Sequence, residues 1–282
     1  SLTFAGVEVL VSRIARDYAL HQRTQDPKTE MKIQNKTFAM LAVIAAAAAP
    51  SLHAQRFLTW VGDDGDFYSQ SNWNPAAVPS SDDVVAINNG GTATIAADAG
   101  DHELAWLLLG ETEGSSESGH VVMDGGFLRI GIVPSDEKVR IGEGTVQSSF
   151  IMNGGTIYFD GPDDPDLAGS SNAAGINEVD WEVGEHGVGR FEMYGDAEFR
   201  AGDDLKIAEN AAGSGSCLID GDARLSVGSG IAISNGGENE QVMVIAGNAV
   251  VEAGNSMGAG NPDGHTDEGY LTLSIGGGHA DL

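Results

Sequence analysis

The sequence predicts an all-β protein built as a β-solenoid, with about three short strands in each coil. Three observations support this prediction: a strand-turn-strand unit recurs along the chain, its apolar residues alternate with polar ones, and glycine occupies its turns. The 282 residues include 40 glycines and yet retain many branched apolar side chains. That combination excludes a disordered glycine-rich linker and is typical of short strands joined by tight turns.

The first strand of each unit carries two apolar residues separated by one position and followed by a glycine turn. The glycines stand at positions 125, 154, 195, 221, 247 and 277, which are 29, 41, 26, 26 and 30 residues apart. Such period-two alternation bounded by Gly, Asn and Asp indicates a strand that ends in a turn. The apolar pairs are Val121/Met123, Phe150/Met152, Phe191/Met193, Cys217/Ile219, Met243/Ile245 and Leu273/Ile275.

Two further strands complete the predicted coil. One follows each turn, at Leu128/Ile130/Ile132, Ile157/Phe159, Ala197/Phe199, Ala223/Leu225/Val227 and Ala249/Val251/Ala253. Another precedes each unit, at Leu107/Leu109, Val139/Ile141, Trp181/Val183, Leu205/Ile207 and Ile231/Ile233. Three strands in about 26 residues suit a solenoid coil whose strands stack about 4.8 Å apart on those of the next coil.

An antiparallel sandwich or barrel is the alternative fold. Asp124-Gly125-Gly126 and Asn153-Gly154-Gly155 could also form hairpin turns. We favour the solenoid because the spacing and the apolar columns repeat together.

The first 54 residues are predicted not to belong to the fold. Residues 31–54 resemble a secretory signal peptide, with Lys32 and Lys36 before an alanine-rich apolar segment and a small residue, Ala54, at the cleavage position. Residues 1–30 precede this segment and are expected to be an upstream, non-domain stretch. The protein is therefore expected to be secreted, extracellular or on the outer cell surface, with no membrane span after cleavage of the signal peptide.

The remaining chain is expected to form a cap followed by repeats. Residues 55–104 contain Trp60 and Trp73 but no repeat, so we expect them to cap the first coil and protect its strand edge. Residues 105–282 are the predicted solenoid repeats. The chain ends at Leu282 inside a repeat, which suggests a fragment.

Composition excludes several classes of partner and site. A net charge of −28, from 42 acidic and 14 basic residues, disfavours nucleic acids and anionic membranes. The single cysteine, Cys217, excludes an intramolecular disulfide and a zinc site made of cysteines, and its apolar column predicts a buried side chain. The scattered histidines show none of the spacings typical of a transition-metal site.

One acidic insert is a candidate calcium site. The 41-residue interval between repeats contains about fifteen extra residues rich in proline, glycine and aspartate. Its carboxylates offer the oxygen ligands that Ca²⁺ prefers, and a strongly acidic protein would gain by binding cations. A solvated acidic loop is the favoured interpretation of the same residues, because clusters of charge in loops usually serve solubility. The candidate ligands are Asp160, Asp163, Asp164 and Asp166, and no other cofactor is expected.

One part of the sequence resembles a known family. Thr59-Trp60-Val61-Gly62, Ser71-Asn72-Trp73-Asn74 and Val84-Val85-Ala86-Ile87 are similar to the opening of secreted bacterial proteins with autotransporter-associated β-strand repeats. The later repeats also resemble those of such proteins, which often carry sorting or anchoring signals of the PEP-CTERM or autotransporter type. This resemblance implies a right-handed parallel β-helix and a cell-surface role, and it implies no substrate.

The sequence favours a structural or adhesive module without catalytic activity. It contains no nucleophile elbow, phosphate loop or dinucleotide fingerprint in a suitable context. Expected partners are a surface polysaccharide or other surface proteins, and the protein is expected to be a monomer. Two alternatives stay open: a carbohydrate-binding or polysaccharide-degrading β-helix, and a fragment whose activity lies in a missing C-terminal domain. The carbohydrate alternative needs outward aromatic residues beside carboxylates, and the candidates are Tyr158, Tyr194 and Trp106.

The few basic residues of the repeats are predicted to serve as outward ion-pair partners of neighbouring acids. They are Arg129, Arg140, Arg190, Arg200, Lys206 and Arg224.

Overall fold

A computed structural model describes residues 55–110, 116–131, 139–159, 180–208, 213–233, 241–254, 256–259, 272–276 and 279–281. All of them belong to one unit, which spans residues 54–282. The predicted signal peptide at 31–54, the upstream stretch at 1–30 and the candidate calcium ligands Asp160, Asp163, Asp164 and Asp166 lie outside the described residues. No helix in the described part of the chain has the length and apolarity that crossing a bilayer requires.

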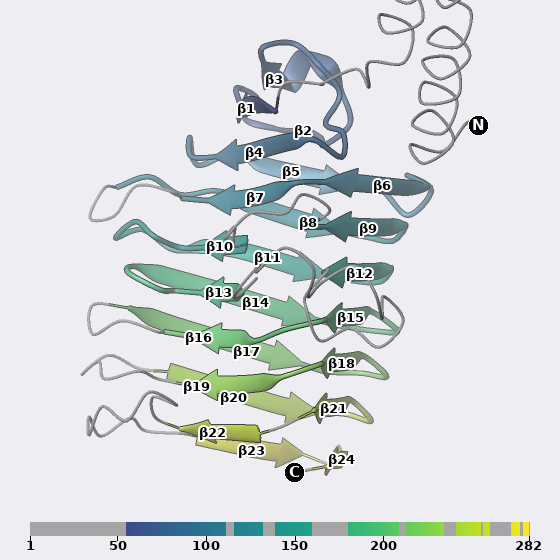
Figure 1. The fold of residues 1–282 in the computed structure, drawn as a ribbon, viewed down its shortest axis with the longest axis vertical. Coiled ribbons are helices and arrows are strands. Elements are labelled where there is room, and N and C mark those ends of the chain that lie inside the picture. Colours follow the sequence, from purple (N-terminus) through teal and green to yellow (C-terminus); the bar gives the residue numbers. More distant parts are fainter. Residues whose placement is uncertain are drawn as a thin grey trace, which may run out of the picture. The chain divides into compact units, whose positions relative to one another are not determined.

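The described strands form three sheets that run along one stack (Figure 1). Sheet A contains β1 (Arg56–Trp60), β3 (Trp73–Asn74), β4 (Asp83–Ile87), β7 (Trp106–Leu109), β10 (Val139–Ile141), β13 (Trp181–Val183), β16 (Leu205–Ile207), β19 (Gly230–Ile233) and β22 (Ser256–Ala259). Sheet B contains β2 (Asp64–Asp66), β5 (Thr92–Ile95), β8 (His120–Met123), β11 (Ser148–Met152), β14 (Val188–Met193), β17 (Ser214–Ile219), β20 (Gln241–Ala246) and β23 (Thr272–Gly276). Sheet C contains β6 (Asp101–Leu104), β9 (Phe127–Ile130), β12 (Thr156–Phe159), β15 (Glu198–Ala201), β18 (Arg224–Val227), β21 (Val250–Ala253) and β24 (His279–Asp281).

Each coil contributes one strand to each sheet, in the order A, B, C. Every strand pairs in parallel with its counterpart in the next coil, and only β1 with β3 is antiparallel among the described pairs. The winding in Figure 1 is right-handed, as it is in nearly all parallel crossovers. The prediction of a right-handed parallel β-solenoid with three short strands per coil is confirmed.

The inward side chains stack into apolar columns because the coils pair in exact register. On sheet C, for example, Leu128, Ile157 and Phe199 are direct neighbours on successive strands, and all three are fully buried. Trp181 lies at the centre of an aromatic cluster, with its ring 4.8–5.7 Å from four phenylalanine rings at tilted to edge-on angles. These phenylalanines are Phe150, Phe159, Phe191 and Phe199. Edge-to-face contacts of this kind stabilise aromatic pairs beyond the area they bury.

The corner between sheets A and B requires a left-handed backbone. Gly110, Gly142 and Gly184 end three successive sheet A strands with φ values of 66°, 89° and 72°, and Ala208 repeats the conformation with φ 56°. At Gly184 a Cβ atom would lie 2.1 Å from the carbonyl oxygen of Ser214. Glycine serves this corner because a side chain would meet the backbone of the following coil.

Residues before the first regular coil cover the first strand of sheet A. Strand β1 pairs with β4, while the short 3₁₀ helix Gln70–Asn72 and β3 cover its other side. Trp60, Phe67 and Trp73 fill the cap with edge-on contacts, and the Trp73 indole N–H donates to the Phe67 carbonyl at 2.7 Å. Regular three-strand pairing already begins at β4, so the first coil lies within the segment predicted as cap.

Candidate functional site

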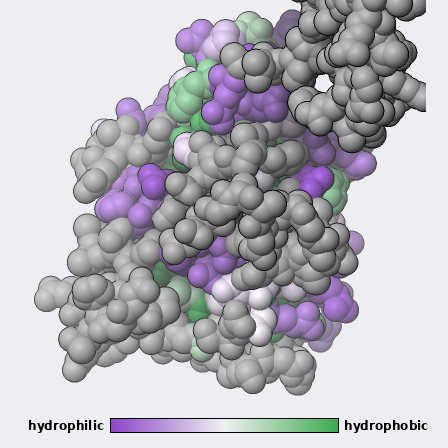
Figure 2. Space-filling view, viewed as in Figure 1, coloured by the Kyte–Doolittle hydropathy of each residue, from purple (hydrophilic) through white to green (hydrophobic). Residues whose placement is uncertain are grey.

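The outward face of sheet C carries three of the seven basic residues in the described part of the chain. Parallel register places the outward residues of β9, β12, β15, β18 and β21 in two columns. One column carries Phe127, Thr156, Glu198, Arg224 and Val250, and the other carries Arg129, Tyr158, Arg200, Ser226 and Glu252. On the face seen in Figure 2, the described surface is largely hydrophilic with small apolar areas. Three arginines on one face are notable in a chain with only 14 basic residues.

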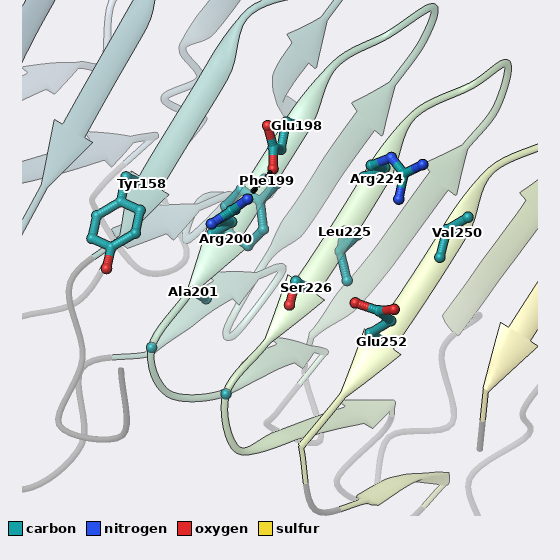
Figure 3. A pocket seen from close by; sticks show the side chains of 12 residues that line it. Tyr158, Glu198, Phe199, Arg200, Ala201, Arg224, Leu225, Ser226, Val250 and Glu252 are labelled. Atoms are coloured by element: carbon teal, nitrogen blue, oxygen red, sulfur yellow. Dashed lines mark hydrogen bonds and ion pairs between the residues drawn. The ribbon is translucent and has the colours of Figure 1, made fainter. Parts of the chain in front are cut away.

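A groove of about 330 Å³ lies on this face (Figure 3). Tyr158 on β12 stands at one side of it and Glu252 on β21 at the other, with Arg200 and Ser226 between them. The stacked strands therefore form an open, elongated surface that suits an extended ligand better than a compact one.

The groove combines a flat ring with several hydrogen-bonding groups. The Arg129 guanidinium lies 5.8 Å from the centre of the Tyr158 ring, within the range of a cation–π contact. Arg200 binds Glu198 on its own strand through Nε and a second nitrogen, at 2.8 Å each. Arg224 makes no ion pair with any residue the structure describes, so its guanidinium is available to a ligand.

The three aromatic candidates from the sequence lie on different sheets. Tyr158 is in the groove on sheet C. Tyr194 follows β14 of sheet B, where its hydroxyl donates to Glu192 at 2.9 Å. Burial and the bond to Glu192 raise the pKa of the Tyr194 hydroxyl. Trp106 lies on sheet A beside the buried apolar residues Val84, Ala86 and Leu108. The sequence could not distinguish among them because all three alternate outward.

Basic residues outside sheet C pair with acids, as the sequence predicted. On sheet A, Lys206 binds the buried Asp180 at 2.8 Å, and Arg140 lies 3.3 Å from Glu182. On sheet B, Arg190 binds Glu192. On sheet C, Arg200 likewise binds Glu198, whereas Arg224 makes no ion pair with a described residue.

A second cluster lies at the corner between sheets A and B. Glu143 and Glu185 follow the corner glycines of two adjacent coils, and His186 follows Glu185. The Nδ1 atom of His186 lies 2.9 Å from Glu143 Oε2 and 3.6 Å from Glu185 Oε2. Burial and the Glu185 charge raise the pKa of Glu143 to about 7, against the opposing effects of His186 and Arg140.

Comparison with known proteins adds no relative. No protein-family model, curated protein or solved structure matches this chain. The groove on sheet C and the corner cluster are therefore the two features from which a function can be inferred.

Sequence reasoning did not anticipate the corner cluster. Gly142-Glu143 and Gly184-Glu185 were recognisable as a repeated strand ending, but Glu143 and His186 are 43 residues apart in the chain. Because the insert at 160–179 lies between Glu143 and His186 in the sequence, their separation does not indicate that the two residues belong to adjacent coils. A comparison of the corner positions across the repeats is the one signal that could have suggested the cluster.

Proposed function

We propose that this protein is a secreted, non-catalytic adhesive β-solenoid that binds a surface polysaccharide along the outward face of sheet C. The observation that carries this proposal is the groove in which Tyr158 lies beside a ladder of arginine, serine and glutamate side chains. Secretion is supported by the signal-like residues 31–54 and by the resemblance to autotransporter-associated repeat proteins.

The chemistry of the groove suits a sugar chain. The Tyr158 ring offers an apolar face for a pyranose ring, and its hydroxyl, Ser226 and Glu252 offer hydrogen bonds to sugar hydroxyls. Arg224 adds a cation that is not engaged by any described acid. Because outward positions recur at the strand spacing of about 4.8 Å, an extended sugar chain can contact several successive coils, each through different side chains.

The carboxylates of the groove support binding rather than glycoside hydrolysis. Glu198 and Glu252 are separated by two strand spacings and two residues, which places their Cα atoms roughly 12 Å apart. Catalytic pairs have carboxyl groups about 5–5.5 Å apart in retaining and about 6.5–9.5 Å apart in inverting enzymes, so these two side chains would have to turn toward each other to act as a pair. Glu198 is instead held by Arg200 on its own strand.

The test is a glycan array followed by titration of the full chain with the glycans that it retains. Tyr158→Ala is expected to weaken binding by about tenfold or more, because it removes the stacking ring, and Arg224→Ala to weaken it less. Tyr194→Ala is the matched control, since it removes a tyrosine from another sheet.

Circular dichroism spectra and thermal midpoints should establish that all variants fold. Absence of any retained glycan, or equal loss in the Tyr158 and Tyr194 variants, would contradict the proposed binding surface. Release of shorter saccharides during incubation with a retained polysaccharide would show catalysis and overturn the non-catalytic assignment.

A further inference from the structure

We infer that the corner formed by Glu143, Glu185 and His186 binds one divalent transition-metal ion, with Zn²⁺ as the best-matched ion. The three residues come from adjacent coils, and each can direct one ligand atom to a common point. This site lies at the corner between sheets A and B, so the inference does not depend on glycan binding by sheet C.

The spacing of the ligand atoms is that of a small coordination sphere. One oxygen of each carboxylate and the imidazole nitrogen all lie within 4.8 Å of one another. The Nδ1 atom of His186 is 2.9 Å from the Glu143 oxygen and 3.6 Å from the Glu185 oxygen. Tetrahedral ligands held roughly 2.0–2.1 Å from zinc lie about 3.3–3.4 Å from each other, a value between the two separations measured from His186.

A buried oxygen of Glu143 supplies a second, independent indication. The Glu143 side chain is only 3% exposed, and its Oε1 atom has no hydrogen-bond partner among the described residues. Its other oxygen already contacts His186, so the carboxyl group is directed into the cluster. A buried carboxylate oxygen without a partner is unfavourable, and a cation at this point would satisfy it.

The charges around the corner leave room for a divalent cation. Glu143, Glu182 and Glu185 are all buried, and Arg140 is the guanidinium that lies near Glu182 and Glu185, at 3.3 and 3.4 Å. Lys206 on β16 lies opposite Glu182 and binds the buried Asp180 at 2.8 Å. Four buried carboxylates therefore stand beside two fixed cations and His186, and acidic groups outnumber basic ones. The Arg140 Nε atom lies 3.4 Å from Glu185 Oε2 and helps to position the Glu185 carboxylate.

The ligand types favour zinc over calcium. Imidazole nitrogen with carboxylate oxygen is a common ligand set for Zn²⁺, and three protein ligands leave a fourth position for water. Calcium requires six to eight oxygen ligands, which these three side chains cannot supply. His186 is 29% exposed, so an ion can reach the cluster from solvent.

Calorimetric titration of the chelator-treated full chain with zinc chloride tests this inference. The wild-type protein should bind one zinc ion per chain and show a raised thermal midpoint. Glu143→Gln and His186→Ala should each weaken zinc binding by more than roughly tenfold, since even the loss of a ligand's own partner weakens metal sites about 10- to 100-fold. His186 is partly exposed, so its variant should fold even if the Glu143 variant does not.

Glu198→Gln is the matched control, because Glu198 lies on sheet C and belongs to no part of the cluster. Loss of zinc binding in both cluster variants, with normal binding in the control, would support the site. Absence of saturable zinc binding, unchanged binding in either cluster variant, or a larger thermal shift with calcium chloride than with zinc would overturn it.

Discussion

The corner glycines offer a direct test of how the coils pack. Gly184 and Gly100 both have a positive φ, of 72° and 82°, but a Cβ atom meets very different surroundings at the two sites. At Gly184 it would lie 2.1 Å from the Ser214 oxygen and 2.6 Å from the Ser214 carbonyl carbon. At Gly100 it would meet no atom within 4 Å. Alanine at these two positions therefore separates the effect of φ from the effect of crowding.

The magnitudes follow from that difference. Alanine in a left-handed conformation destabilises the folded state by about 1–2 kcal/mol. Replacing glycine by alanine also lowers the conformational entropy of the unfolded chain, which offsets about 0.4–1 kcal/mol of this. Gly100→Ala should therefore destabilise the protein by about 1 kcal/mol or less. Gly184→Ala carries the same strain and also forces the backbone of two coils apart, which adds about 1–3 kcal/mol. Its total is about 1–4 kcal/mol.

Urea denaturation followed by tryptophan fluorescence would measure both variants. Trp60, Trp73 and Trp181 are buried, so their emission reports the loss of the core. The midpoint should fall clearly for Gly184→Ala and barely for Gly100→Ala. Equal shifts would refute the argument, because they would mean that glycine is required at the corner for φ alone.

Three other predictions follow from the core and the cap. Trp181→Ala should destabilise the protein by about 3–5 kcal/mol in the same urea assay, because it empties the space among the packed phenylalanines. A second prediction concerns the ion pair between Arg56 and Asp83. Burial raises the pKa of Asp83, but hydrogen bonds from Arg56 and Ser80 outweigh it and hold this pKa below its usual value. The ion pair of Arg56 with Asp83 therefore contributes its full stability above the pKa of an unfolded aspartate, about 3.9, and this contribution is lost as the pH falls through the lower pKa of Asp83 in the folded protein. Arg56→Met should lower the free energy of unfolding by about 1.5–3 kcal/mol at pH 7. This difference from wild type should shrink below about pH 4. A difference that does not change with pH would contradict the ion pair. Burial raises the pKa of the Cys217 thiol, so iodoacetamide should modify it only after unfolding, as mass spectrometry would detect.

Much of the fold could be predicted because its signal is local. Alternation in a segment such as Phe191 to Met193 shows which side chains face inward, and a glycine after it marks the turn. The repeat then shows that strands of the same type stack on one another. The segment before the repeats was recognisable for the same reason, since its aromatic residues interrupt the repeat.

The candidate sites could not be predicted from local patterns. Tyr158 and Tyr194 look alike in the sequence, yet one lines a groove and the other binds a buried glutamate. Glu143 and His186 form a pair only because the coils on either side of a long insert are adjacent. The histidine spacings in the sequence concern only neighbours along the chain. The coil brings His186 next to Glu143, which is 43 residues away in the sequence.

The sequence by itself determined the strands, the turns and the inward columns, because each depends on residues within a few positions of one another. The tertiary structure decided which outward side chains share a face and which corner residues meet. The physical reason is register: parallel pairing aligns each strand with its counterpart one coil away, and the length of the intervening loops hides that alignment in the sequence.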